Sequence, residues 1–168
     1  ARRAKALGAE LFVLDDGWFG KRTDNTKGLG DWYENRDRLP EGLDGLCKKL
    51  NAIGLDFGIW VEPEMVNPDS DLYRAHPDWV VVNPNYTPLL HCSQYVLDLC
   101  NEEVRKYIID SMTRVFTSTN IAYVKWDCNR NITECYSPTL IGRQKEFSYR
   151  YMLGLYSILQ TLTERFPN

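Results

Sequence analysis

The stretch YVKWDCNRNITE (residues 123–134) begins as an apolar run and then places charged and polar side chains in succession. Together with the two residues before it, the segment 121–127 has the apolar and β-branched composition of a buried strand. Asp127 ends this predicted strand between Lys125 and Arg130. Such a cluster fits either a surface loop with an ordinary ion pair or a strand end at an active site, and the surrounding sequence distinguishes the two.

Three further segments resemble the strand before Asp127, namely residues 10–16, 55–62 and 95–99. Helical patterns lie between and after the four predicted strands, at residues 42–54, 69–77, 102–119 and from about 140 to 165. Nearly continuous apolar strands that alternate with helices predict a parallel sheet buried on both faces. The sequence therefore predicts an α/β fold.

Charged and aromatic side chains gather where the predicted strands end, as in Asp15–Asp16, Glu62, Asp98 and Asp127. In a (β/α)8 barrel the carboxyl ends of the strands form the catalytic face. An open nucleotide-binding sheet is the alternative, but its glycine-rich phosphate motifs do not occur. We therefore predict part of a (β/α)8 TIM-type barrel with about four βα units. A whole barrel takes roughly 250 residues, so residues 1–168 are expected to be one partial domain cut from something larger.

The composition argues against several classes of partner. Lys and Arg total 20 against 23 Asp and Glu, a net charge of -3 that offers no basic excess to nucleic acid. The apolar runs are too short to cross a membrane. Five cysteines without a C-x-x-C pair are typical of reduced thiols and predict a cytoplasmic protein. We expect no metal and no cofactor, because the two histidines lie in predicted loops.

Two clusters at the strand ends suggest sugar chemistry. Asp15 and Asp16 could accept hydrogen bonds from neighbouring hydroxyl groups. The alternatives are a metal site, or an Asp16 that only caps the following turn. Lys125 precedes Asp127 by two residues on the same strand face and should lower the pKa of its carboxyl. An ionised carboxylate suits the nucleophile of a retaining glycosidase, or a structural Lys–Asp pair. Trp60 fits either a core position or, on the same strand face as Glu62, a position that looks into the barrel mouth.

These motifs together resemble glycoside hydrolase family 36, the α-galactosidases or melibiases. The resemblance extends in order over essentially the whole chain, and its specific part joins GIWVEPEMV (58–66) to YVKWDCNR (123–130). It implies hydrolysis of terminal α-galactosides of the melibiose and raffinose type, through a covalent galactosyl-aspartate. It further implies the roles of the site residues: Asp127 is the nucleophile, Asp15 and Asp16 bind the galactose 4- and 6-hydroxyls, Trp60 lies beside the sugar, and Lys125 and Asn129 bind ring hydroxyls.

The sequence departs from the family pattern in two places. Cys92 stands where many members have an arginine, so we expect it to line the substrate pocket, and the preference for the leaving group stays open. The family's acid/base aspartate belongs to a later strand, and no matching motif follows Ile132. We therefore expect the isolated chain to be inactive. The alternatives are a non-catalytic sugar-binding module, an α-N-acetylgalactosaminidase or a galactosyl transferase.

The expected partner is a small α-galactoside or galactose. A partial barrel would also expose strand edges, which predicts either a homo-oligomer or an unstable monomer.

Overall fold

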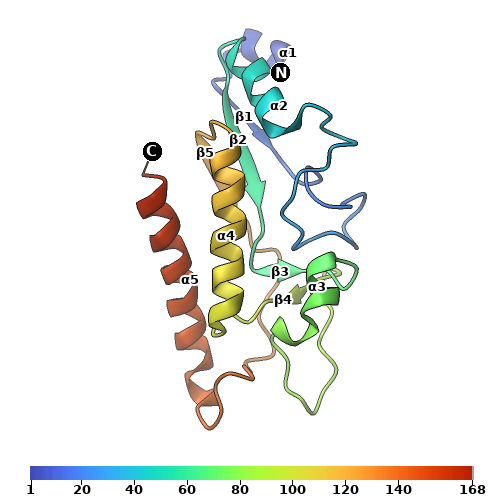
Figure 1. Ribbon diagram of the computed structural model, residues 1–168, viewed down its shortest axis with the longest axis vertical. Helices are drawn as coiled ribbons and strands as arrows, with labels where there is room; N and C mark the ends of the chain where they lie inside the picture. The colour runs from blue at the N-terminus through green and yellow to red at the C-terminus, as the bar shows by residue number, and fades with distance from the viewer. Residues whose placement is uncertain (168) are drawn as a thin grey trace.

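Three parallel strands form the central sheet of the structure, a computed structural model that describes residues 1–167 (Figure 1). They are β1 (Leu11–Leu14), β2 (Asp56–Val61) and β5 (Tyr123–Trp126). Their order is β1-β2-β5, with both pairs parallel. The predicted α/β class with a parallel sheet is confirmed.

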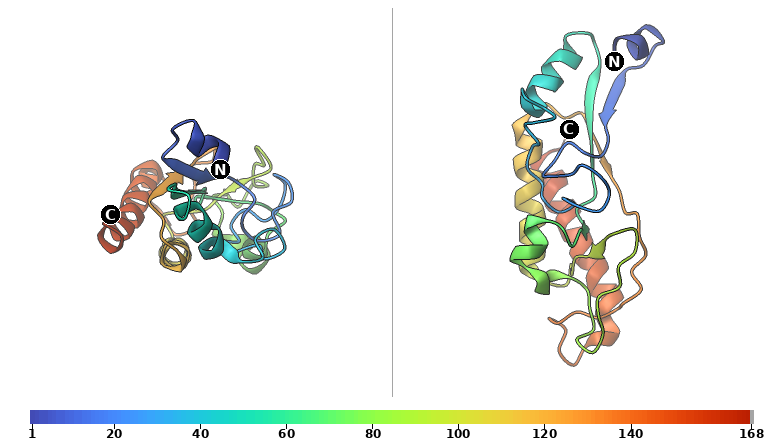
Figure 2. Two further views of the ribbon diagram at one scale, coloured as in Figure 1. Left: turned by 90° about the horizontal axis from the view of Figure 1, so that it is seen from above. Right: turned by 90° about the vertical axis from the view of Figure 1, so that its right-hand side faces the viewer.

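A long helix follows each strand of this sheet: α2 (Gly42–Asn51), α4 (Glu102–Ser118) and α5 (Phe147–Arg165). Helices α2 and α4 connect successive strands and lie along one face of the sheet, with α5 beside α4 (Figures 1 and 2). The shorter helices are α1 (Arg2–Ala6), α3 (Asp71–Ala75), and the 3-10 turns η1 (Pro77–Trp79) and η2 (Gln144–Glu146). The described residues thus form three βα units.

The prediction of a parallel strand at residues 95–99 is wrong. Only Tyr95–Val96 is a strand, β4, and it pairs antiparallel with β3 (Met65–Val66), while β2 pairs directly with β5. The next two backbone N–H groups of the segment donate to carbonyl oxygens outside the parallel sheet. Leu97 N donates to Glu64 O at 2.9 Å, and Asp98 N donates to Trp79 O, in η1, at 2.8 Å. A five-residue apolar run does not reveal which strand it pairs with.

Asp98 consequently does not end a strand of the parallel sheet. Its side chain is buried, and it accepts hydrogen bonds from Ser137 Oγ at 2.5 Å and from Cys100 N at 3.0 Å. The contact with Ser137 joins the segment after β4 to the segment before α5. Asp98 therefore has a structural environment, unlike the more exposed Asp15 and Asp16.

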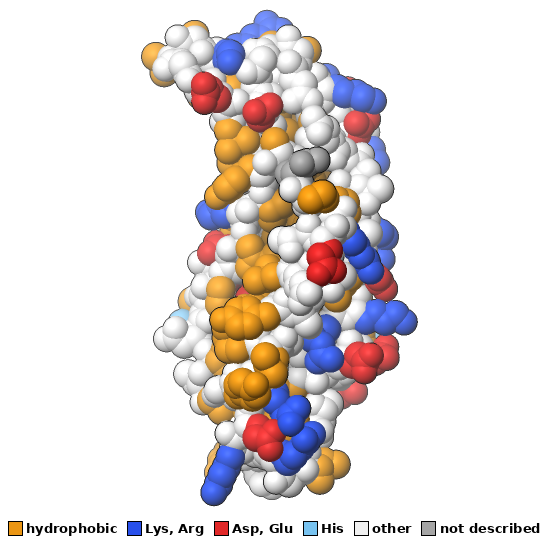
Figure 3. Space-filling model, turned by 90° about the vertical axis from the view of Figure 1, so that its left-hand side faces the viewer, with side chains coloured by type: hydrophobic (Ala, Val, Ile, Leu, Met, Phe, Trp, Pro, Cys, Tyr) orange, Lys and Arg blue, Asp and Glu red, His pale blue; other side chains and the backbone are white. Residues whose placement is uncertain are grey.

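The outer side of the molecule carries a band of exposed apolar side chains along α5 (Figure 3). Its members on that helix are Tyr149, Met152, Leu153 and Tyr156. In the part of the chain that the structure describes, β1 and β5 are the two edge strands of the sheet. Self-association over these surfaces stays a prediction. Within residues 1–167, no helix combines the length and the apolar character needed to cross a membrane.

At Gly154, helix α5 lies directly against the loop before α4. A Cβ at this position would lie 2.3 Å from the Leu99 carbonyl oxygen, a backbone atom that a rotamer change cannot move. We expect Gly154→Ala to lower the free energy of unfolding by about 2 kcal/mol, since overpacking outweighs the better helix propensity of alanine. Urea denaturation measures the change. Met152→Ala, at an exposed position of the same helix, is the control and should change stability by less than about 1 kcal/mol. Equal stability of the two variants would contradict the expected clash.

Candidate active site

Asp127 directly follows β5, and three N–H groups donate to its carboxylate. Trp60 Nε1 and Asn129 Nδ2 each lie 2.8 Å from Asp127 Oδ2. The backbone N of Cys128 lies 3.0 Å from Oδ1. Trp60 comes from β2, so neighbouring strands of the sheet together orient this carboxylate. Three N–H donors make this environment complementary to a charged carboxylate.

The pKa of Asp127 is lowered, as predicted, but mostly for a different reason. Burial alone would raise the pKa, and the hydrogen bonds from Trp60, Asn129 and Cys128 outweigh it. The charge of Lys125 makes a smaller contribution in the same direction. The Lys125 ammonium instead pairs with Asp15, with Nζ 3.2 Å from Oδ2. The hydrogen bonds from Trp60, Asn129 and Cys128 therefore keep Asp127 ionised more than the adjacent lysine does.

Arg130, the other cation next to Asp127 in the sequence, is buried and bonds to backbone. Its Nη1 donates to the carbonyl oxygens of Leu89 at 2.8 Å and Gln94 at 2.6 Å. Arg130 therefore ties the loop after β5 to the segment that precedes β4. Lys125, Asp127 and Arg130 are close in the sequence, but they do not form one cluster of ion pairs in the structure.

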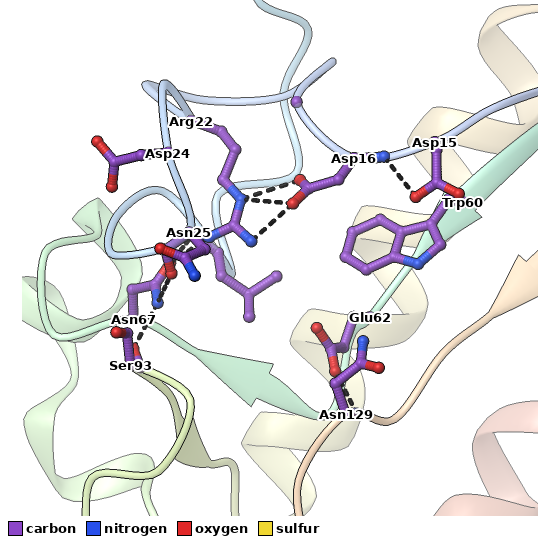
Figure 4. Close-up of polar contacts among 12 residues, drawn as sticks. Asp15, Asp16, Arg22, Asp24, Asn25, Trp60, Glu62, Asn67, Ser93 and Asn129 are labelled. Atoms are coloured by element: carbon purple, nitrogen blue, oxygen red, sulfur yellow. Dashed lines mark hydrogen bonds and ion pairs between the residues drawn. The ribbon is translucent and has the colours of Figure 1, made fainter.

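The adjacent carboxylates Asp15 and Asp16 point in different directions from the end of β1 (Figure 4). Asp15 accepts from Lys125 and also from the backbone N of Asp16 at 2.8 Å. Asp16 accepts from Arg22, whose Nη2 lies 2.8 Å from Oδ2. The Asp15 and Asp16 side chains stay 64% and 38% exposed, so both can still accept hydrogen bonds from a ligand's hydroxyl groups.

Trp60 is a core residue as well as a neighbour of Asp127. It is 3% exposed, and its ring stacks on Phe19 with centroids 6.1 Å apart and planes at 9°. Trp32 packs tilted at 6.4 Å, and Trp18 Nε1 donates to the Trp60 carbonyl oxygen at 2.9 Å. Because this aromatic cluster covers its ring, the contact of Trp60 with the site is its indole N–H.

Glu62 is a buried carboxyl group to which sequence analysis assigned no role. It accepts from the backbone N of Asn129 at 2.6 Å (Figure 4). It also accepts from Gln94 Nε2 at 3.0 Å. Glu62 thus holds the backbone of Asn129, whose side chain donates to Asp127. Burial raises the pKa of Glu62, and the charge of Asp127 adds to the rise. Glu62 directly follows β2, and strand alternation already predicted that it shares a face with Trp60, two residues earlier.

This raised pKa predicts how stability changes with pH. A folded-state pKa above the unfolded value means that the native state binds the proton more tightly, so the unfolding free energy falls as pH rises from the unfolded pKa through the raised one. Glu62→Gln removes this fall. Between pH 4 and pH 7, we expect the free energy of unfolding of the variant to rise by on the order of 1 kcal/mol relative to that of the wild type.

The glutamine can be accommodated because the buried Gln94 Oε1 has no hydrogen-bond partner among residues 1–167 and could accept from it after an amide flip of Gln94. Urea unfolding at several pH values measures the difference, with the exposed Glu10→Gln as the matched control. A constant offset between Glu62→Gln and wild type across this pH range would contradict the assignment.

Cys92 lies in a tight turn formed by residues 91–94. The backbone N and O of His91 and Gln94 are hydrogen bonded in both directions, and the two central residues, Cys92 and Ser93, have φ of 52° and 60°. The Cys92 thiol is exposed, with Sγ 3.4 Å from His91 Nδ1. No cluster of three or more His, Cys, Asp or Glu side chains able to hold a metal ion occurs in the described part of the chain.

Comparisons with known proteins converge on one family. The Melibiase family model matches residues 1–168. Alpha-galactosidase AgaA of Geobacillus stearothermophilus is 54% identical over 169 residues, which cover 100% of this chain and 23% of that protein. Alpha-galactosidase 1 of Pediococcus pentosaceus is 46% identical over 98% of this chain and 23% of its own length. The chain thus spans about a quarter of the curated relatives that it matches.

Solved structures agree with the sequence relatives. A variant of AgaA in complex with raffinose superimposes with a TM-score of 0.96 at 53% identity, covering 99% of this chain and 23% of that one. Another AgaA variant, in complex with stachyose, has a TM-score of 0.95 at 53% identity over the same shares.

Proposed function

The chain belongs to the Melibiase family, and from this premise we propose that it supplies the nucleophile side of an α-galactosidase active site. The observation that carries the proposal is the environment of Asp127, a carboxylate held by Trp60, Asn129 and the Cys128 backbone at the end of a parallel strand. Three parallel βα units with this carboxylate at their carboxyl edge are consistent with part of a (β/α)8 barrel.

In the proposed reaction, an Asp127 oxygen attacks the anomeric carbon of a terminal α-galactoside. The bond from this carbon to the leaving oxygen breaks, and a second carboxyl group, which we place outside residues 1–168, gives that oxygen a proton. Water then loses a proton to the same group and displaces Asp127, releasing galactose with retained configuration. The donors around Asp127 keep it ionised for the first step.

The proposed sugar-binding groups lie around the nucleophile. Asp15 and Lys125 form an ion pair that offers both an acceptor and a donor to hydroxyl groups, and Asp16 offers a second carboxylate. Asn129 donates to Asp127 through Nδ2 and keeps its side-chain oxygen for a ligand. Binding of melibiose-type and raffinose-type sugars is supported by the raffinose and stachyose complexes of relatives.

The proposal is tested with the protein expressed from the complete reading frame that encodes this chain. We expect hydrolysis of p-nitrophenyl α-galactoside and melibiose, no hydrolysis of the β-anomer, and release of α-galactose first when the reaction is followed by proton NMR. Release of β-galactose first would contradict a retaining mechanism. Binding of galactose without turnover of either substrate would instead indicate a non-catalytic sugar-binding protein.

A further inference from the structure

Arg22 lies in the loop after β1, and its guanidinium contacts both carboxylate oxygens of Asp16 (Figure 4). Its Nε lies 2.9 Å from Asp16 Oδ1, and its Nη2 lies 2.8 Å from Oδ2. The Arg22 side chain is 4% exposed, whereas the Asp16 side chain is 38% exposed. A two-point contact with a planar guanidinium fixes both the position and the plane of a carboxylate. Arg22 therefore orients Asp16 and leaves its outer edge accessible.

Asn67, which follows β3, holds Arg22 from the other side. Its Oδ1 accepts from Arg22 Nη1 and from the backbone N of Leu29, both at 2.8 Å. Its Nδ2 donates to the carbonyl oxygens of Asn25 at 3.2 Å and Ser93 at 2.6 Å. The side chain is fully buried and uses both amide hydrogens and both lone pairs of its oxygen. One asparagine thus connects the loop after β1, the end of β3 and the turn that contains Cys92.

The turn at residues 91–94, to which Asn67 donates, has a backbone conformation that is costly in free energy. Cys92 and Ser93 are consecutive non-glycine residues with positive φ, each of which costs free energy relative to the usual backbone regions. The Ser93 carbonyl that accepts from Asn67 lies within this turn. The network therefore fixes Asp16 and the Cys92 turn relative to each other.

We propose that Arg22 and Asn67 are positioning residues of the sugar site. They act through Asp16 and the Cys92 turn and do not themselves touch the sugar. The assignment rests on the proposed function, since the orientation of Asp16 affects catalysis only if Asp16 accepts a hydrogen bond from a substrate hydroxyl. Arg22 orients Asp16, so it contributes to turnover through the one galactose hydroxyl group that Asp16 binds.

Arg22→Lys tests this assignment. A lysine keeps the charge but cannot bond to both Asp16 oxygens and to Asn67 at once. We expect kcat/KM for p-nitrophenyl α-galactoside to fall about 10- to 100-fold in the protein from the complete reading frame. The same substitution should have little effect on either the 4-deoxy or the 6-deoxy analogue, whichever lacks the hydroxyl that Asp16 binds. Arg36→Lys, at an exposed arginine paired with Glu34, is the control and should not change kcat/KM.

Asn67→Asp is the second variant in case Arg22→Lys does not fold. It keeps the acceptor for Arg22 but turns a carboxylate oxygen toward the Ser93 carbonyl, and it should show the same dependence on the substrate hydroxyl. Circular dichroism and thermal melting report whether each variant is folded. An equal loss on all three substrates in a folded variant would overturn the positioning role. Inactivity of the unmodified protein on every α-galactoside would overturn the proposed function, and this assignment with it.

Discussion

Asp127→Asn is expected to lower kcat for α-galactoside hydrolysis by at least about 10⁴-fold in the protein from the complete reading frame, because the proposed covalent step has no other nucleophile. The asparagine has the same shape, and its carbonyl oxygen can still accept from Trp60 and Asn129, so we expect the fold to persist. Steady-state kinetics with p-nitrophenyl α-galactoside measure the loss. Asp110→Asn, at an exposed position of α4, is the matched control and should not change kcat.

A chemical rescue distinguishes loss of the nucleophile from loss of structure. In Asp127→Ala, azide could occupy the vacated volume and attack the anomeric carbon from the face opposite the leaving p-nitrophenolate. The expected product is β-galactosyl azide, which mass spectrometry and NMR identify. A loss of kcat below about 100-fold in Asp127→Asn would show that Asp127 is not the nucleophile.

Residues 1–168 expressed alone are expected to show no turnover above that of the same segment carrying Asp127→Asn. In the described part of the chain, the other carboxyl groups near this edge of the sheet are poor proton donors to a substrate. Glu62 is 1% exposed, and Asp15 and Asp16 are each paired with a cation. The deficit should be largest with melibiose, whose leaving sugar needs a proton, and smaller with p-nitrophenyl α-galactoside.

This experiment needs a folded segment to be informative. Circular dichroism establishes folding, and the protein from the complete reading frame at equal concentration provides the reference activity. The free edges of β1 and β5 suggest that light scattering should accompany the assay. Hydrolysis of melibiose by the isolated segment at a rate comparable to the reference would show that residues 1–168 contain their own acid/base group.

Local sequence patterns predicted the elements whose signals are themselves local. The strands at β1, β2 and β5 follow from apolar runs that end in charged residues. The start of α4 follows from Asn101, whose side chain accepts from the backbone N of Glu103 at 3.0 Å. The segment at residues 95–99 was predicted wrongly because the composition of a short apolar run is the same in a parallel and in an antiparallel pair.

The sequence by itself determined the α/β class, the parallel sheet and the family, because each is encoded in composition, periodicity and motifs along the chain. Only the tertiary structure decided which groups meet. Lys125 pairs with Asp15 rather than Asp127, Trp60 donates to Asp127, and Arg22 joins Asp16 to Asn67. Hydrogen bonds and ion pairs depend on distances of about 3 Å and on angles between separate strands and loops. Such distances are set by the packing of the whole sheet, which no single stretch of sequence contains.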